Sequence, residues 1–475
     1  MNLGKYKRIV FNLAASQLFL VGLFLPLNEA PQIARAAPSD LFVTPGGSGD
    51  CSQGNPCGLQ TALNQAVDGD ILYLAQGSYT GTGGAVITVT KSIAIYGGWD
   101  GATTTPVVRD PDTYPTTLNG EDTRRAVEIS GNISPTIDGF VITGGKAPDG
   151  GGVYILDASP IIQNNVITAN RTIDSGTYTD GRGGGIFVGG ASSAVIAQNH
   201  ILGNTSGYGG GIYHDGATAI TITANEIVDN VASGRGGGIL LENSPDIVRA
   251  NLISGNTSAT DGGGMLIWAA APLVEANRIT GNSASTAGGG ISMGNNATPS
   301  LFNNLLISNA QDGVFVASSS PVIVNNTIVG SGLVNSGDGI RLWSDPGCAP
   351  PYCIEGSIIN NILVSYEVGI FGSGVITPVM DYNDVWGNTT ADYSLPAGVV
   401  PGTHNISLDP LFANPTADDY HLQSGSPCVD AGDPAGAPPA PPTDIDGDTR
   451  PIGNRVDIGA DEVRFNIFLP VVLRH

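Results

Sequence analysis

An asparagine that returns at a nearly constant interval is the feature that most constrains the fold of this chain. The sequence has 475 residues, and four successive intervals in its middle are 26, 26, 26 and 27 residues. The asparagines that begin equivalent stretches are Asn165, Asn199, Asn225, Asn251, Asn277, Asn304, Asn326 and Asn361. A second column lies five residues later and consists of Asn170, Asn204, Asn230, Asn256, Asn282 and Asn309. Such a period indicates structural units that stack on one another.

Apolar residues share this period. Two aliphatic columns lie two positions after and three positions before the first asparagine, for example Ile227 and Ile222 around Asn225. A glycine triplet precedes an apolar residue six times, at Val153, Ile186, Ile212, Ile239, Met265 and Ile291. Each repeat thus has three short alternating segments, which predicts three strands with one buried face each. This suits one coil of a parallel β-helix, because a propeller blade requires four strands.

The asparagines and glycines suit the corners of such coils. A side-chain amide has both donors and an acceptor, so stacked asparagines can hydrogen-bond along a ladder. Asn and Gly also tolerate the left-handed backbone that sharp corners need. We therefore expect aliphatic ladders inside a tube and asparagine ladders at its corners.

Composition narrows the class of function. Charged residues form only 13% of the chain and the formal net charge is −23, which argues against a nucleic-acid partner. The apolar share of 41% is sufficient for a large core. We expect a monomer that binds no nucleic acid.

The first 36 residues have the layout of a secretory signal peptide. Three basic residues, the last of them Arg8, form a positive start, and residues 9–27 are mostly apolar. Ala34 and Ala36 then offer a small-residue cleavage site. The alternative is an uncleaved membrane anchor, although polar residues interrupt the apolar run. We expect a secreted, extracellular or surface-attached protein with no membrane span after cleavage.

The cysteines fit an oxidising compartment. Cys51 and Cys57 bracket one short loop, and Cys348 and Cys353 bracket a second, Pro-rich loop. Each spacing suits a local disulfide. Cys428 is left without an assigned partner. Zinc is a poor alternative, because no CxxC pair or clustered histidine accompanies these residues.

Short motifs near the N-terminus support the β-helix. Residues 59–67 read as a short amphipathic helix that can cover the open end of a tube. A Gly-Asp pair at 69–70 and a Gly-Ser-Tyr segment at 77–79 follow it. Together with the repeats, these motifs resemble the right-handed parallel β-helix proteins of the pectin lyase-like superfamily. The resemblance implies an all-β fold, with ~26-residue, three-strand coils and a short N-terminal capping helix.

The C-terminal part has motifs of its own. Residues 409–412 (Asp-Pro-Leu-Phe), 425–432 (Gly-Ser-Pro-Cys-Val-Asp-Ala-Gly) and 457–462 (Asp-Ile-Gly-Ala-Asp-Glu) resemble the choice-of-anchor domains of bacterial surface proteins. Residues 465–473 are apolar but too short to cross a bilayer as a helix. They are either a sorting tail or a strand that closes the last coil. The expected organisation is a signal peptide (1–36), cap and first coils (37–100), β-helix repeats (101–395) and a small β-rich C-terminal module with its tail (396–475).

The resemblance says less about activity than about fold. Enzymes of the superfamily act mostly on acidic polysaccharides, with Ca²⁺-binding aspartates and a basic residue in lyases, or paired aspartates and a Gly-His-Gly segment in hydrolases. We find neither set in the sequence. The favoured hypothesis is a protein that binds polysaccharide or another surface partner without catalysis. A polysaccharide lyase or glycoside hydrolase, and an adhesin or autotransporter-like passenger, remain the alternatives.

Two stacked columns are the candidate ligand-binding residues. The residue before each glycine triplet gives one column, which contains Arg182, Tyr208, Arg235 and Asp261. An Arg–Tyr–Arg stack can hold a sugar carboxylate or ring. The second column is expected to face outward as an exposed aromatic stripe, and it contains Phe187 and Tyr213. The alternatives are charge pairing between coils for the first column and a covering loop for the second.

Two further motifs have both a functional and a structural interpretation. Asp444, Asp446 and Asp448 have calcium-loop spacing, so Ca²⁺ is the one cofactor that the sequence suggests. The alternative is a polar turn whose aspartates accept hydrogen bonds from backbone N–H groups. His214 should point inward, where a core histidine is a better interpretation than a catalytic base.

Overall fold

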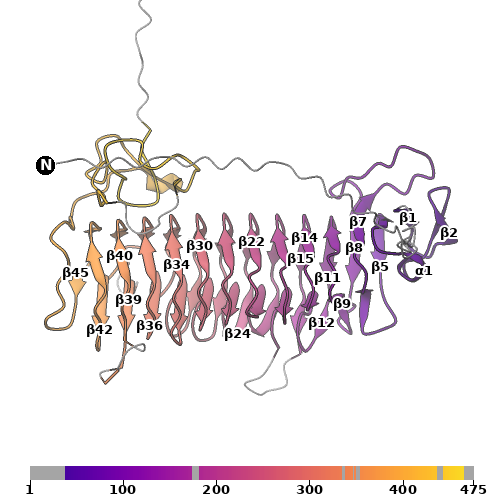
Figure 1. The fold of residues 1–475 in the computed structure, drawn as a ribbon, viewed down its shortest axis with the longest axis horizontal. Coiled ribbons are helices and arrows are strands. Elements are labelled where there is room, and N and C mark those ends of the chain that lie inside the picture. The colour runs from indigo at the N-terminus through magenta and orange to yellow at the C-terminus, as the bar shows by residue number, and fades with distance from the viewer. Residues whose placement is uncertain are drawn as a thin grey trace, which may run out of the picture. The chain divides into compact units, whose positions relative to one another are not determined.

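The repeats wind into a right-handed parallel β-helix (Figure 1), as the sequence predicts. The computed structural model describes residues 38–173, 181–333, 337–345, 347–348, 353–435 and 442–464, all within one compact unit. The predicted signal peptide and the apolar residues 465–473 lie outside these ranges. Among the described residues, no helix has the length and hydrophobicity that a membrane crossing requires.

Three long sheets, here called A, B and C, form the walls of the tube, and nearly all their strands pair in parallel. The strands of sheet A are β1 (Asp40–Val43), β2 (Ser48–Ser52), β3 (Asn55–Cys57), β4 (Ile71–Ala75), β7 (Ala94–Trp99), β10 (Thr136–Asp138), β14 (Ile161–Gln163), β18 (Val195–Ala197), β22 (Thr221–Thr223), β26 (Ile247–Arg249), β30 (Leu273–Glu275), β34 (Ser300–Phe302), β37 (Val322–Val324), β40 (Ser357–Ile359) and β43 (Val379–Asp381).

Sheets B and C each contain twelve strands within the described residues. Sheet B comprises β5 (Gly77–Tyr79), β8 (Thr116–Asn119), β11 (Phe140–Thr143), β15 (Val166–Thr168), β19 (His200–Leu202), β23 (Glu226–Val228), β27 (Leu252–Ser254), β31 (Arg278–Thr280), β35 (Leu305–Ile307), β38 (Thr327–Val329), β41 (Ile362–Val364) and β44 (Asp384–Trp386). Sheet C comprises β6 (Ala85–Val89), β9 (Arg125–Ser130), β13 (Val153–Leu156), β17 (Ile186–Gly189), β21 (Ile212–Asp215), β25 (Ile239–Glu242), β29 (Met265–Trp268), β33 (Ile291–Gly294), β36 (Val314–Ala317), β39 (Asp338–Trp343), β42 (Val368–Ser373) and β45 (Ala391–Ser394).

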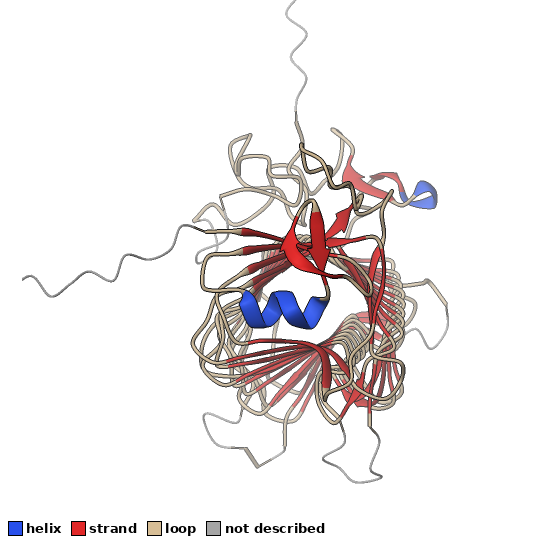
Figure 2. Ribbon diagram, turned by 90° about the vertical axis from the view of Figure 1, so that its right-hand side faces the viewer, coloured by secondary structure: helices blue, strands red, loops and turns tan. Residues whose placement is uncertain are grey.

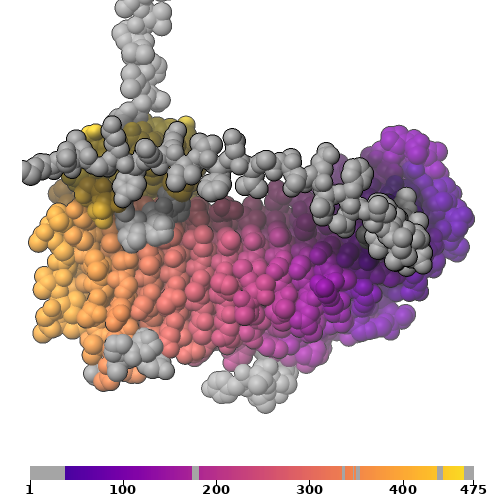
Figure 3. All heavy atoms as spheres, in the orientation of Figure 1, coloured from indigo at the N-terminus to yellow at the C-terminus, as the bar shows by residue number. Residues whose placement is uncertain are grey.

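The aliphatic columns fill the tube in register. Ile222 pairs with Ile196 on one side and with Val248 on the other, and all three side chains are fully buried. Equivalent side chains of successive coils also form regular columns on the outer surface (Figure 3). The period in the sequence is therefore the coil itself, since each residue stacks on its counterpart one repeat away.

The asparagine ladders form as expected, but the left-handed residue is not the asparagine. Asn251 donates from Nδ2 to the Oδ1 of Asn277 (2.9 Å), and its own Oδ1 accepts from the Nδ2 of Asn225 (3.0 Å). The positive φ values belong to the preceding residues, such as Ala224 and Ala250, both at 53°. The turn at the preceding residue directs the amide inward, where its hydrogen bonds replace those of water.

A fourth, shorter sheet was not expected from the sequence. Sheet D lies between sheets B and C in the order of the chain, and its last strand is β32. Its strands are β12 (Lys146–Ala147), β16 (Arg171–Thr172), β20 (Thr205–Tyr208), β24 (Val231–Arg235), β28 (Thr257–Ser258) and β32 (Ser283–Ala284). The glycine triplets connect sheet D to sheet C. Gly209 has a φ of 61°, and a Cβ there would lie 2.8 Å from the Cβ of Tyr213, so the close approach requires glycine.

The N-terminal cap contains the short helix α1 (Leu59–Gln65) and the antiparallel pair β2–β3. Figure 2 shows the helix lying across the open end of the tube. It buries Leu59, Ala62 and Leu63 against the first coils. Lys91 donates to the carbonyl oxygens of Leu63 (2.8 Å) and Ala66 (2.6 Å), which satisfies the end of the helix.

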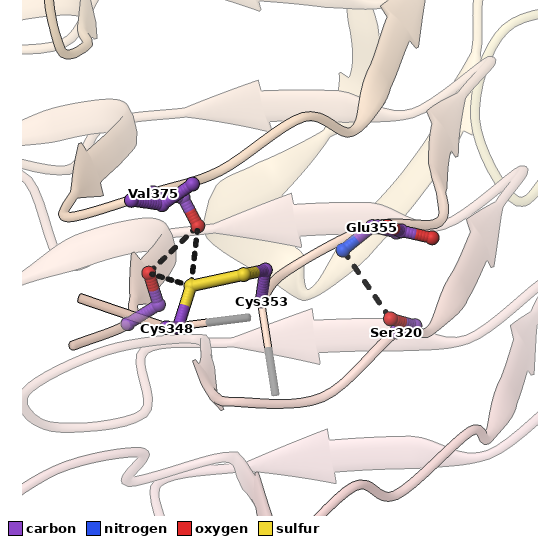
Figure 4. Close-up of a disulfide and its surroundings, with 6 residues drawn as sticks. Ser320, Cys348, Cys353, Glu355 and Val375 are labelled. Carbon is purple, nitrogen blue, oxygen red and sulfur yellow. Dashed lines mark hydrogen bonds between the residues drawn. A yellow bond between two sulfur atoms is a disulfide. The ribbon is translucent and has the colours of Figure 1, made fainter. Parts of the chain in front are cut away.

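Both expected disulfides are present. Cys51 bonds to Cys57 within the cap, and Cys348 bonds to Cys353 beside β39. Around the second bridge, the backbone N–H of Glu355 donates to the Oγ of Ser320 at 3.2 Å (Figure 4). Cys428 is unpaired and buried.

The C-terminal module packs on the outer face of sheet B. Among its described residues it contains one two-stranded sheet, β46 (Phe412–Asn414) with β47 (Asp419–Leu422), and a short 3-10 helix, η1 (Pro415–Ala417). The buried cluster at the contact consists of Val329, Ile362, Val364, Leu422, Cys428, Ile458 and Val463. The N–H of Ala460 also donates to the Oγ1 of Thr327 (3.0 Å). The module is therefore seated on the last coils by both apolar and polar contacts.

Candidate functional site

The first candidate column stacks as expected, but its arginines are paired with carboxylates. Arg182 lies between Asp149 and Tyr208, and Tyr208 pairs with Arg235 in the next coil. The Nε and the terminal nitrogen of Arg182 contact the two carboxylate oxygens of Asp149 at 3.1 and 2.9 Å. The Nε of Arg235 lies 3.4 Å from the Oδ2 of Asp261. This geometry favours the alternative interpretation, which is charge pairing between coils.

The expected exposed aromatic stripe is wrong at Phe187 and Tyr213. Each is only 4% exposed, and their rings stack 5.8 Å apart. Tyr208 of sheet D packs against them, and the Arg182 guanidinium lies 4.9 Å from the centre of the Phe187 ring. Because sheet D and the glycine connections run over this column, the side chains that alternation turns out of the tube are still buried.

Sheet D covers the outer face of sheet C only as far as its last strand, and sheet C becomes accessible in the next coils. Phe315 on β36, Arg341 on β39 and Phe371 on β42 occupy the same outward column and are all partly exposed. They follow β32, the last strand of sheet D. The outward column of sheet C is thus buried in its middle and open near its C-terminal end.

A cavity of about 350 Å³ lies at this open face. Its lining residues are Gln311, Gly337, Asp338, Arg341, Glu367, Val368 and Phe371. The Arg341 guanidinium lies 5.4 Å from the centre of the Phe371 ring. The Nε of Arg341 is buried and finds no hydrogen-bond partner among the described residues. The cavity therefore combines an aromatic ring, two carboxylates and a guanidinium.

Two aspartates from adjacent coils stack at the back of this cavity. The Asp338 side chain is 12% exposed and the Asp312 side chain only 1%. The backbone N–H of Asp338 donates to the Oδ1 of Asp312 at 3.1 Å. Burial and the charge of Asp312 raise the pKa of Asp338 to about 7, although Arg341 opposes this rise. Asp338 can therefore carry a proton near neutral pH, as a general acid requires.

The sequence contains a signal for this site, which is the interruption of the glycine triplet in two successive coils. Gly-Gly-Gly becomes Gln311-Asp312-Gly313 in one coil and Gly337-Asp338-Gly339 in the next. The aspartates take the place of the middle glycine. Asp312 lies two residues before β36, and Asp338 begins β39, which pairs with β36. Only the stacked structure shows that Asp338 lines a cavity and that Asp312 lies directly behind it.

Replacing Asp338 with asparagine should stabilise the protein at neutral pH. The folded Asp338 has a pKa of about 7 and the unfolded residue one near 3.8, so the unfolded chain loses this proton first. Wild-type stability therefore falls as the pH rises from about 4 to 7. A pKa difference of this size corresponds to about 4 kcal/mol, and solvent in the cavity screens part of it. We expect Asp338→Asn to gain about 2 kcal/mol at pH 7 and above.

Urea unfolding at pH 4, 5.5, 7 and 8 measures this gain. The difference between Asp338→Asn and wild type should grow up to about pH 7 and then stay constant. Asp345→Asn, which changes an exposed carboxylate in the loop after β39, is the matched control and should show no such trend. A difference for Asp338→Asn that does not change with pH would contradict the assignment.

The structure does not bring Asp444, Asp446 and Asp448 together as a calcium site. The Oδ1 of Asp444 accepts from the N–H groups of Asp446 (3.0 Å) and Asp448 (2.7 Å), and Asp448 pairs with Arg464. The carboxylate of Asp444 is thus used to hold the turn, which is the alternative interpretation. Asp446 instead lies 2.7 Å from the Nε2 of His421.

His214 points into the core, as predicted. It is fully buried, and its Nδ1 lies 2.8 Å from the Oδ2 of Asp246, which also accepts from the Oγ of Ser244 at 2.7 Å. Its hydrogen bonds serve the packing of the coils.

Comparison with known proteins agrees with this fold. Residues 119–283 and 210–348 match a family model described as the right handed beta helix region. None of the curated proteins matches the chain. Among solved structures, pectate lyase Pel9A aligns with 91% of this chain and 98% of its own, at 13% identity and a TM-score of 0.47. The PL6 family alginate lyase AlyGC aligns with 76% of this chain and 53% of its own, at 14% identity and a TM-score of 0.38, so this chain spans about half the length of that lyase.

Proposed function

We propose that this protein is a secreted polysaccharide-binding protein and that the cavity at Asp338 and Phe371 is its sugar site. The observation that carries the proposal is the opening of sheet C beyond sheet D, where an aromatic ring, carboxylates and a guanidinium line one cavity. The predicted signal peptide and the two disulfides support secretion.

The lining has the two kinds of group that sugar recognition uses. An aromatic ring such as Phe371 can pack against the apolar face of a pyranose ring. The carboxylates of Asp338 and Glu367 can accept hydrogen bonds from sugar hydroxyls, and Arg341 can donate to them. A volume of about 350 Å³ is within the range of small-ligand sites.

The charge of the cavity favours neutral or amino sugars over uronic acids. Asp338 and Glu367 line it, Asp312 lies behind Asp338, and Arg341 is the one cation among the lining residues. The formal net charge of −23 would also repel a polyanion over the distances at which charge guides association. The proposed ligand therefore differs from the acidic polysaccharides that the family resemblance implies.

Replacing Phe371 with alanine should weaken binding to a neutral polysaccharide by about fivefold or more, since truncating an aromatic side chain at the centre of a binding site costs over about 1 kcal/mol. Affinity electrophoresis with glucan, mannan, xylan, chitosan and polygalacturonate measures the effect. Phe315→Ala is the matched control, because Phe315 lies on the same column but does not line the cavity. Unchanged mobility of Phe371→Ala, or preferential binding of wild type to polygalacturonate, would contradict the proposal.

Glycoside hydrolysis at the same cavity is the second candidate. The observation that favours it is Asp338, whose pKa of about 7 leaves part of the population protonated at neutral pH and which shares the cavity with Glu367. An acid of this kind can protonate a glycosidic oxygen while a second carboxylate acts on the sugar or on water. Release of new reducing ends from the same polysaccharides tests this candidate separately from binding.

A further inference from the structure

We infer that the C-terminal module binds a transition-metal ion, with Zn²⁺ as the best fit, through His421, Asp446 and Asp461. One ligand atom from each residue lies within 4.8 Å of the others. His421 belongs to β47, Asp446 to the turn that begins at Asp444, and Asp461 to the segment that packs on sheet B. The site would join three segments that are separate in the sequence.

The orientation of His421 allows a metal ion to replace the proton between its Nε2 and Asp446. Its Nδ1 lies 2.6 Å from the Oδ1 of Asp419, while its Nε2 faces the Oδ2 of Asp446 at 2.7 Å. A carboxylate that accepts one ring N–H fixes the tautomer and presents the other nitrogen to a metal. Asp461 is held as well, because its Oδ2 accepts from the N–H of Leu422 at 2.7 Å.

The donor set selects the metal. One imidazole nitrogen and two carboxylates suit Zn²⁺, with water as the fourth ligand. Ca²⁺ takes six to eight oxygen ligands, and the carboxylates of Asp444 and Asp448 are engaged with backbone N–H groups and with Arg464. A transition metal is therefore favoured over the calcium that the aspartate spacing alone suggests.

The buried charge of the module supplies an independent argument. Its described part buries the carboxylates of Asp444, Asp457, Asp461 and Glu462, and Arg450 is its one buried cation. Buried charges are costly unless they are paired. A divalent cation next to Asp461 would offset the excess negative charge at the place where His421 already supplies a nitrogen ligand. This inference does not rest on the proposed sugar site.

Isothermal titration of the full chain, after removal of metals with a chelator, tests the site. ZnCl₂ should bind with one-to-one stoichiometry and micromolar or tighter affinity, and CaCl₂ should bind more weakly. Asp446→Asn should weaken Zn²⁺ binding about 100-fold, because the loss of a metal ligand lowers the affinity at least as much as the loss of a group that only orients a ligand. The turn should survive this change, since Asp444 rather than Asp446 accepts its hydrogen bonds.

His421→Ala should lose Zn²⁺ binding to the same extent. His404→Ala is the matched control, because His404 is also exposed and has a carboxylate partner, Asp381 at 2.9 Å, but the described residues place no third ligand beside this pair. A wild-type protein that takes up no Zn²⁺ would overturn the inference. Equal Zn²⁺ affinity in wild type and Asp446→Asn would also overturn it. The same holds if His404→Ala loses as much Zn²⁺ affinity as His421→Ala.

Discussion

Replacing Asn251 with alanine should destabilise the β-helix by about 5 kcal/mol. Asn251 donates to the carbonyl oxygens of Ile222 (2.9 Å) and Arg249 (3.0 Å) and to the side chain of Asn277 (2.9 Å). Its Oδ1 accepts two further hydrogen bonds from Asn225. Alanine removes all five contacts in a fully enclosed corner, where the two Nδ2 protons are shared among three acceptors. The partners that lose their hydrogen bonds together account for the expected loss of about 5 kcal/mol.

Urea unfolding followed by far-ultraviolet circular dichroism measures this loss. Arg249→Ala is the matched control, because it changes an exposed side chain two residues away in the same corner. We expect the control to stay within about 0.5 kcal/mol of wild type. If Asn251→Ala unfolds within 1 kcal/mol of wild type, the amide ladder does not hold the coils together.

The coils could be predicted because each position in a solenoid meets its own counterpart. Ile222 contacts Ile196 and Val248, so a column that stays aliphatic in the sequence becomes a ladder in space. The asparagine columns follow the same logic. Their backbone could not be assigned as readily, because the sequence does not say which residue of a corner takes the left-handed conformation, and Ala250 does so instead of Asn251.

The sequence does not predict that sheet D covers the outer face of sheet C. For this reason the candidate ligand residues of sheet C were expected to be exposed. Alternation separates side chains that face into the tube from those that face out of it, but it does not show what lies outside. The strands of sheet D are as short as the two residues Lys146–Ala147, too short for alternation to reveal them. Alternation therefore predicts that Phe187 and Tyr213 are exposed, although sheet D buries them.

The C-terminal module was the least predictable part. Its contacts join residues far apart in the sequence, such as Asn303 with Thr443 and Thr327 with Ala460. Loops carry most of the described residues, so no period relates one segment to another. The Asp444 motif suggested a metal, but only the folded chain shows that Asp446 faces His421 instead of its neighbours.

Replacing Arg450 with alanine should open this module while the β-helix stays folded. The guanidinium donates to the carbonyl oxygens of Asp457 (3.2 Å) and Gly459 (2.8 Å) and lies 3.4 Å from the carboxylate of Glu462. The side chains of Arg450 and Glu462 are 2% and 1% exposed. Without Arg450 the carboxylate of Glu462 would be buried with no cation, which costs about 3–5 kcal/mol.

The thiol of Cys428 reports this opening directly. The other four cysteines form the two disulfides, and Cys428 is fully buried where the module meets sheet B. A loss of about 3 kcal/mol should raise the population of the open module, and with it the rate of labelling by a thiol reagent, about 100-fold or more. Arg455→Ala, an exposed arginine of the same module, should label as slowly as wild type. Equal labelling of Arg450→Ala and wild type would mean that the apolar contacts of Leu422 and Ile458 hold the module without help from Arg450.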